Sequence, residues 1–157
     1  MWILSLLKPD RPATPSAEGG LLSIAEPVKE RASMVFFELF SRAPEIVRVA
    51  RGEVLFREGE PGEAMYVLVL GQASVSLGGR ELEVLLPGGI VGEMSIVSPG
   101  PRTATVIAAA DSEFVEIDVR RFHELVRQVP EFALQVMRTL SERLRRADGA
   151  LAVGGLR

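Results

Sequence analysis

The residues best suited to chemistry lie in one glycine-rich segment, residues 88–106, which reads GGIVGEMSIVSPGPRTATV. Glu93 follows Gly92 directly, and Arg102 stands nine residues after the glutamate. A short helix predicted to begin at Glu93 would offer free backbone amides, and an arginine beside them would offer paired donors, which together favour an anion. A barrel core has no need of an arginine here, so the segment predicts a phosphate site.

Glu93 is a poor neighbour for a phosphate but a good acceptor for a ribose hydroxyl. In dinucleotide-binding folds, an acidic residue accepts a hydrogen bond from the ribose while a helix N-terminus takes the phosphate. Glu93 and Arg102 together therefore indicate a ligand that carries both a sugar and a phosphate. The alternative interpretation is an ordinary salt bridge between the two side chains, in a barrel that has no ligand.

The same segment resembles the phosphate-binding cassette of cyclic-nucleotide-binding domains, such as those of catabolite activators and protein kinase A regulatory subunits. Gly92-Glu93 and the later run Pro101-Arg102-Thr103-Ala104-Thr105-Val106 match the usual pattern, while Val91 stands where the family has phenylalanine. The run GEVLFREGEPGEAMYVLVLG at residues 52–71 resembles the glycine-punctuated first strands of the family. The resemblance covers about residues 35–147.

This resemblance implies a role for each residue of the site. Arg102 would pair with the exocyclic phosphate oxygens, and Glu93 would accept from the ribose 2′-hydroxyl. Backbone amides near Gly92 and Thr103 would complete the phosphate cradle. A hydroxyl at Thr103 is compatible with cAMP, which is favoured, and with cGMP. The expected ligand-binding residues are Gly92, Glu93, Met94, Ser95, Arg102, Thr103, Ala104, Val91 and Val84, with Leu86 as a further apolar wall.

These residues lie within a region, residues 46–117, in which short β-prone runs alternate with glycines. This pattern predicts an all-β sandwich or barrel with tight turns, and only Gly92 is expected to approach a ligand closely. Candidate strands are residues 46–50, 53–56, 65–70, 72–77, 81–86, 103–109 and 112–117, giving seven or eight strands. The resemblance implies an eight-stranded β-roll (jelly roll, or double-stranded β-helix), so the fold is mainly β with flanking helices.

Helical patterns are expected on both sides of the barrel. One or two short helices are predicted within residues 23–42, Asp118 can cap a helix, and Pro130 opens a last helix that ends near Ala147. In this last helix, one apolar stripe contains Ala133, Met137, Leu140 and Leu144, with Arg138, Arg143, Arg145 and Arg146 mostly outside it. The stripe allows two interpretations: a helix packed on the barrel, or the seam of a homodimer.

Composition divides the chain into three parts. The run PDRPATPSAEGG at residues 9–20 favours a linker, so residues 1–22 are expected to form a flexible N-terminal segment. Residues 23–150 would form the cyclic-nucleotide-binding domain, and residues 151–157 a flexible tail. The apolar run at residues 1–7 is too short for a membrane span, and a cytoplasmic location is expected.

Several classes of function are disfavoured by composition. The chain has no cysteine and a single histidine, His123, so catalytic triads, haem and iron–sulfur ligation, and cupin-type metal sites lack their ligands. No catalytic residue, metal or cofactor is expected, and the protein is not expected to be an enzyme. The net charge of −3 gives no basic excess for nucleic acid. With only about ten residues after the last helix, no helix-turn-helix and no direct DNA binding are expected.

These observations predict a regulatory sensor that binds a cyclic nucleotide and signals by movement of its C-terminal helices. The effector protein is not identifiable from the sequence. The alternative is a β-roll that binds no nucleotide and serves as a protein-interaction or dimerisation module.

Overall fold

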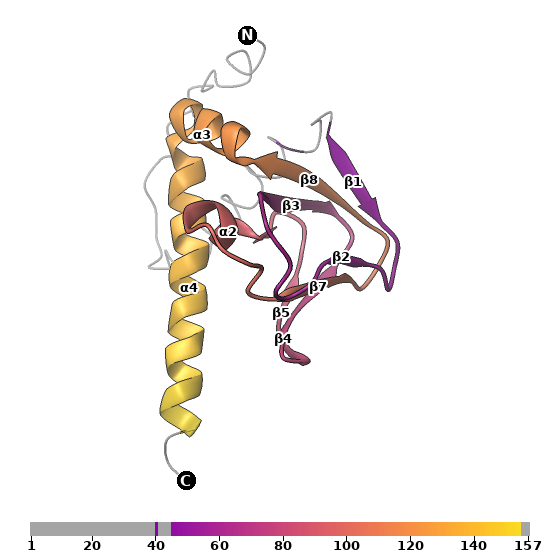
Figure 1. Ribbon diagram of the computed structural model, residues 1–157, viewed down its shortest axis with the longest axis vertical. Coiled ribbons are helices and arrows are strands. Elements are labelled where there is room, and N and C mark those ends of the chain that lie inside the picture. Colours follow the sequence, from indigo (N-terminus) through magenta and orange to yellow (C-terminus); the bar gives the residue numbers. More distant parts are fainter. Residues whose placement is uncertain (1–39, 41–44, 155–157) are drawn as a thin grey trace, which may run out of the picture.

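The computed structural model describes residue 40 and residues 45–154, and within them eight strands form two four-stranded antiparallel sheets (Figure 1). The strands are β1 Ile46–Val49, β2 Val54–Phe56, β3 Ala64–Leu70, β4 Ala73–Leu77, β5 Arg80–Leu85, β6 Ile90–Val91, β7 Thr105–Ala108 and β8 Ser112–Asp118. The helices are α2 Glu93–Val97, α3 Val119–Gln128 and α4 Pro130–Gly154. The predicted eight-stranded β-roll with two C-terminal helices is confirmed.

Strand order is β1-β8-β3-β6 in one sheet and β2-β7-β4-β5 in the other. The seven strands expected from the sequence agree with the structure to within two residues at each end. The eighth strand, β6, was not expected, because two residues paired with Tyr66 and Val67 of β3 are too few to show an alternating pattern.

Two hydrophobic cores meet at β3, whose successive side chains point to opposite faces. Leu68 lies in the core between the two sheets, to which all eight strands contribute. Met65 and Val67 lie in a second core, which the first sheet shares with α3 and α4. The helices therefore cover one face of the roll, and α4 extends along its side past α2 (Figure 1).

The C-terminal helices begin where the sequence predicts. Asp118 caps α3, because its carboxylate accepts a hydrogen bond from the backbone N–H of Arg121 at 2.7 Å. Pro130 is the first residue of α4. This helix continues to Gly154, past its predicted end near Ala147, so the predicted domain boundary at residue 150 falls within it. The single Gly149 costs only about 1 kcal/mol of helix propensity, which does not end a helix otherwise rich in alanine here.

Helix α4 lies on the roll through an apolar stripe that differs from the predicted one. Phe132 and Val136 are buried in the second core, and Leu140 packs against it. Met137 and Leu144, both assigned to the predicted stripe, are 55% and 62% exposed. Both rows have the three-and-four spacing of a helix face, so periodicity could not tell which one faces the roll. Met137 and Leu144 are therefore left in solvent, whereas Leu140, which also belongs to the predicted stripe, packs on the roll.

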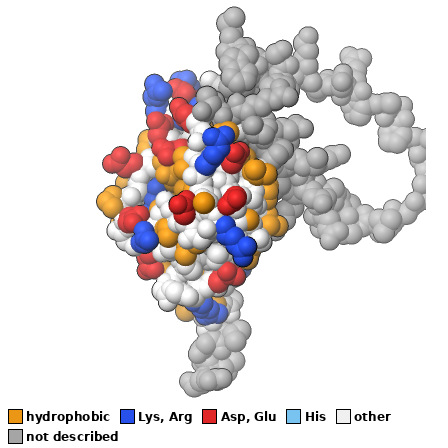
Figure 2. Space-filling model, turned by 90° about the vertical axis from the view of Figure 1, so that its right-hand side faces the viewer, with side chains coloured by type: hydrophobic (Ala, Val, Ile, Leu, Met, Phe, Trp, Pro, Cys, Tyr) orange, Lys and Arg blue, Asp and Glu red, His pale blue; other side chains and the backbone are white. Residues whose placement is uncertain are grey.

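Some expectations fall outside the described residues, including most of the helices predicted within residues 23–42 and the linker at 9–20. Phe40 is described, and its ring packs edge-on against Phe132 at a centroid distance of 6.1 Å. His123 is on α3 beside the ring of Phe122. Among the described residues, no helix combines the length and apolar composition that a membrane crossing needs. On the face shown in Figure 2, acidic and basic side chains are interspersed.

Candidate functional site: a pocket between the roll and helix α4

A pocket of about 420 Å³ opens at the end of the roll that faces α4. Its inner wall is the end of the core between the sheets, with Phe56, Val75 and Val106. Its other walls are residues 91–95 and 102–104 of the cassette, residues 80–83 of β5, and Arg143, Arg146, Ala147 and Ala150 of α4. The pocket thus joins strands of the roll, the cassette and the distant helix α4.

Arg102 lies at the inner end of this pocket and is only 5% exposed. Its Nη1 donates to the carbonyl of Ala64 at 2.6 Å and, more weakly, to Gly92 O and Ser95 Oγ, both at 3.4 Å. Its Nε–H has no hydrogen-bond partner, and no carboxylate pairs with it in the described part of the chain. A buried cation without a counterion is costly, which favours an anionic ligand at this point.

Two aromatic rings hold the guanidinium of Arg102 in place. Its Cζ atom lies 4.3 Å from the ring centroid of Phe56 and 5.7 Å from that of Tyr66. The faces of aromatic rings attract a cation at such distances. These contacts leave the guanidinium edge free for hydrogen bonds to a ligand.

Two glycines leave space for this guanidinium, because a side chain at either position would collide with it. A Cβ atom on Gly62 would lie 2.7 Å from Arg102 Nε, and one on Gly92 would lie 2.5 Å from Arg102 Nη1. Gly92 is also the N-cap of α2, with a left-handed φ of 77°. The sequence predicts a close approach to the ligand site only for Gly92. Gly62 is a second such glycine, and the sequence pattern of turns does not reveal it because its φ is not positive.

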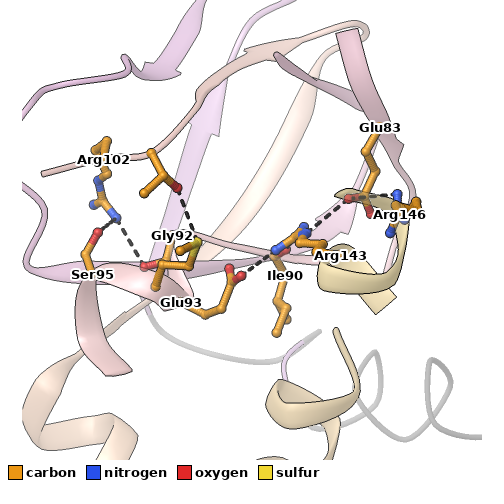
Figure 3. Close-up of polar contacts among 10 residues, drawn as sticks. Glu83, Ile90, Gly92, Glu93, Ser95, Arg102, Arg143 and Arg146 are labelled. Carbon is orange, nitrogen blue, oxygen red and sulfur yellow. Dashed lines mark hydrogen bonds and ion pairs between the residues drawn. The ribbon is translucent and has the colours of Figure 1, made fainter. Parts of the chain in front are cut away.

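Glu93 is the first residue of α2 and is 1% exposed. Its Oε1 accepts a hydrogen bond from Arg143 Nη1 of α4 at 2.6 Å (Figure 3). The expected alternative of a salt bridge between Glu93 and Arg102 is therefore wrong, because the partner of the glutamate comes from α4. Among the described residues, the other oxygen of Glu93 accepts no hydrogen bond.

Arg143 connects three parts of the pocket. Besides Glu93, it donates from Nε to Glu83 Oε2 at 3.1 Å and from Nη2 to the carbonyl of Ile90 at 2.9 Å. Burial lowers the pKa of Arg143, but Glu93 and Glu83 outweigh this and raise the pKa above its usual value. The guanidinium therefore stays charged. Glu83 Oε2 also pairs with Arg146 Nη1 at 3.4 Å, so α4 contacts β5 twice.

The structure brings most of the predicted site residues to the pocket. Val91, Gly92, Glu93, Met94, Ser95, Arg102, Thr103 and Ala104 all line it. At its mouth, the Thr103 hydroxyl donates to Met94 Sδ at 3.4 Å. Val84 and Leu86 are 46% and 59% exposed and do not line the pocket. Strand alternation turns them to solvent and directs Glu83 of β5 inward instead.

Several residues of the site carry no local signal in the sequence. Glu83 interacts with Arg143 and Arg146 across about 60 positions, and Tyr66 of β3 contacts Arg102, which lies in the segment between α2 and β7. Only the three-dimensional path of the chain reveals these pairs. In the described part of the chain, no three His, Cys, Asp or Glu side chains group to hold a metal ion.

Comparisons with known proteins agree with this geometry. A family model described as a cyclic nucleotide-binding domain matches residues 46–129. The CRP-like cAMP-activated global transcriptional regulator of Mycobacterium tuberculosis is 35% identical over 107 residues, which make up 65% of this chain and 48% of that protein. The cGMP-dependent protein kinase of Toxoplasma gondii is 35% identical over 85 residues, 49% of this chain and 9% of the kinase.

A solved structure shows the same fold. The crystal structure of Thermus thermophilus catabolite activator protein superposes with a TM-score of 0.64 at 28% identity, covering 84% of this chain and 61% of that one. The chain spans about half the length of the mycobacterial regulator it matches.

Proposed function

The chain belongs to the cyclic-nucleotide-binding domain family, and we propose that it is a regulatory sensor that binds a cyclic nucleotide monophosphate without converting it. The observation that carries the proposal is the buried Arg102, which has a free Nε–H and no carboxylate partner in the described chain, at the inner end of the pocket. A cyclic phosphate would supply both the missing acceptor and the missing negative charge.

The ribose would bind next to the phosphate. Glu93 neighbours Gly92, whose carbonyl contacts Arg102, and its second carboxylate oxygen is available to accept from a 2′-hydroxyl. Arg143 holds the first oxygen and so fixes the orientation of the carboxylate. cAMP is the favoured ligand, in line with the cAMP-activated mycobacterial relative, and cGMP is the alternative, in line with the cGMP-dependent kinase.

Helix α4 would transmit the signal. Its residues Arg143 and Arg146 bond to the cassette and to β5, so a ligand that enters between them changes the contacts that hold the helix. A ligand can shift the equilibrium between two helix positions only by the difference between its binding free energies for those two positions. We expect the shifted helix to act on an effector protein rather than on DNA directly, and we expect the module to work in the cytoplasm.

An exposed apolar row on α4 favours a homodimer. Met137, Leu144 and Leu151 are 55%, 62% and 74% exposed and follow one another at seven-residue steps. Such spacing places them along one side of the helix, as in a two-stranded coiled coil. The alternative function, a nucleotide-free interaction module, is favoured by this row and by the ion pair that already occupies Glu93.

Thermal unfolding with added ligands tests the proposal. A ligand that binds only the folded protein stabilises it by RT ln(1 + [L]/Kd), so cAMP or cGMP at a hundred times its Kd adds about 2.7 kcal/mol and raises Tm. Linear 5′-AMP serves as the control. Chromatography of the recovered ligand should return it intact. No Tm shift with either cyclic nucleotide would reject the sensor, and conversion to a linear monophosphate would reject a purely binding role.

A further inference from the structure

The outer end of the pocket carries charged side chains that neither phosphate nor ribose would use. Arg102 and Glu83 lie on opposite sides of Glu93, and Arg143 joins Glu93 to Glu83 (Figure 3). If the proposed function holds, with phosphate at Arg102 and ribose at Glu93, the base extends toward Glu83 and Arg146. Both of these residues line the pocket.

Of the other residues at this end, those of α4 offer no polar contact to a base, although Arg80 of β5 also lines the pocket. Ala147 and Ala150 of α4 and Leu82 of β5 have no hydrogen-bonding side chain. Glu81 also lines the pocket, but it accepts from the hydroxyl of Ser74 at 2.6 Å. The α4 side of the base site therefore depends on its two arginines, of which Arg143 is already engaged with three acceptors.

Glu83 and Arg146 present an acceptor beside a donor. Glu83 Oε2 accepts a hydrogen bond from Arg143 at 3.1 Å and forms an ion pair with Arg146 at 3.4 Å, while its Oε1 accepts no hydrogen bond among the described residues. The Glu83 side chain is 20% exposed, so this free oxygen is partly shielded from water. Arg146 forms an ion pair with Glu83 but no hydrogen bond among the described residues, so its five N–H donors remain for a ligand.

We propose that Glu83 and Arg146 determine the base specificity of the site and select adenine. Glu83 Oε1 accepts from the 6-amino group of adenine, and Arg146 donates to N7 of the same edge. On this edge guanine presents two acceptors, O6 and N7, so its O6 would meet the carboxylate without a proton between them. The pair therefore favours cAMP over cGMP by a matched contact with one base and a repulsive contact with the other.

Titration calorimetry with cAMP, cGMP and the cyclic monophosphate of purine riboside, which lacks the 6-amino group, tests this inference. The variants are Glu83→Gln and Arg146→Gln. The matched controls are Glu124→Gln, which changes an exposed carboxylate of α3, and Arg145→Gln, which changes an exposed arginine of α4, and neither residue lines the pocket.

The unaltered protein should bind cAMP more tightly than the other two ligands, by about tenfold or more. In Glu83→Gln the ratio of cAMP to cGMP affinity should fall about tenfold, and in Arg146→Gln it should fall less, while both controls keep it. Equal losses for cAMP and cGMP in Glu83→Gln would show that Glu83 only holds Arg143 in place, which overturns the inference.

Two further outcomes separate this inference from the proposed function. An unaltered protein that prefers cGMP would leave the sensor function standing and overturn the selection of adenine. An unaltered protein that binds none of the three ligands would overturn both, because no base would then reach Glu83.

Discussion

At the scale of single residues, the site depends on a cation that is buried before any ligand arrives. Arg102 is placed by one strong hydrogen bond to the carbonyl of Ala64, by two aromatic rings and by the clearance of two glycines. This arrangement orders the guanidinium in advance, so in the proposed function a phosphate would bind without having to order it.

The clearance at Gly62 gives the first prediction. Gly62→Ala places a methyl group 2.7 Å from Arg102 Nε, so the guanidinium must move and nucleotide affinity should fall about tenfold or more. Gly100→Ala is the control, because its Cβ would meet nothing nearer than Ser98 O at 3.8 Å and its φ is ordinary. Calorimetric titration measures both. Unchanged affinity in Gly62→Ala would mean that Arg102 does not need its present position.

Tyr66, the only tyrosine of the chain, reports on the charge of the site. Burial and the nearby Glu116 raise the pKa of Tyr66, and Arg102 partly opposes this by lowering it. A bound phosphate would neutralise Arg102, so ligand should raise the pKa of Tyr66 further. Ultraviolet titration at 295 nm should therefore show a midpoint above the usual value of about 10, and a higher one with cAMP.

The same shift has a consequence for stability. The pKa of Tyr66 is raised in the folded state, so the neutral tyrosine contributes to the free energy of unfolding. This contribution is fully present below the unfolded pKa of about 10 and is lost as the pH rises through the folded pKa. Tyr66→Phe should lose stability less steeply in this alkaline range. A Tyr66 midpoint that falls on addition of cAMP would contradict the placement of phosphate near Arg102.

At the scale of elements, α4 is tied to the pocket by ion pairs and to the roll by its apolar stripe. Arg143→Gln would leave the buried Glu93 without its cation, which should cost about 3 to 5 kcal/mol of unfolding free energy. Arg145→Gln, on the exposed side of the same helix, should change it by less than about 0.5 kcal/mol. Urea denaturation measures both. Equal unfolding free energies for the two variants would show that the ion pair between Arg143 and Glu93 does not stabilise the packing of α4.

The exposed row of α4 gives a second prediction at this scale. Leu144→Glu places a charge in the proposed dimer seam and should produce monomers, because a buried unpaired carboxylate is costly. Val119→Glu, at an apolar position on α3 that is 45% exposed, should leave the oligomeric state unchanged. Sedimentation velocity distinguishes the two. A native protein that is monomeric at all concentrations would reject the seam.

The sequence predicts the β elements well and the helix faces poorly, for a physical reason. Strands between glycine turns have a local signal, and seven of the eight strands were predicted from it, whereas the two-residue β6 has too little. On α4 two apolar rows fit one period, so the choice between Val136 and Met137 depends on the sheet that receives the helix.

At the scale of the whole molecule, the candidate site divides in the same way. The cassette residues lie within a dozen positions of one another, and their spacing placed Glu93 and Arg102 in one pocket. Glu83 and Arg143 are 60 positions apart and meet only because α4 returns along the roll to β5. Local spacing therefore predicts the residues of the proposed phosphate and ribose sites, while the residues of the proposed base site are found only from the fold.

The pocket, the cassette and α4 together form one unit in which ligand and helix share contacts. Glu93 lines the pocket, and its Oε1 accepts a hydrogen bond from Arg143 of α4. A ligand bound to Glu93 therefore changes a group that also holds the helix. In the proposed sensor, this shared residue would couple ligand binding to the position of the helix.

The most direct test is calorimetric titration of nucleotide-free protein with cAMP, for the unaltered chain, Arg102→Ala and the exposed control Arg57→Ala. We predict saturable binding by the unaltered chain and the control, and a loss of about 2 to 5 kcal/mol of binding free energy in Arg102→Ala. Circular dichroism of each variant checks that the β-roll is retained. A folded Arg102→Ala protein that binds cAMP as tightly as the unaltered chain would contradict the assignment of Arg102 as the phosphate ligand.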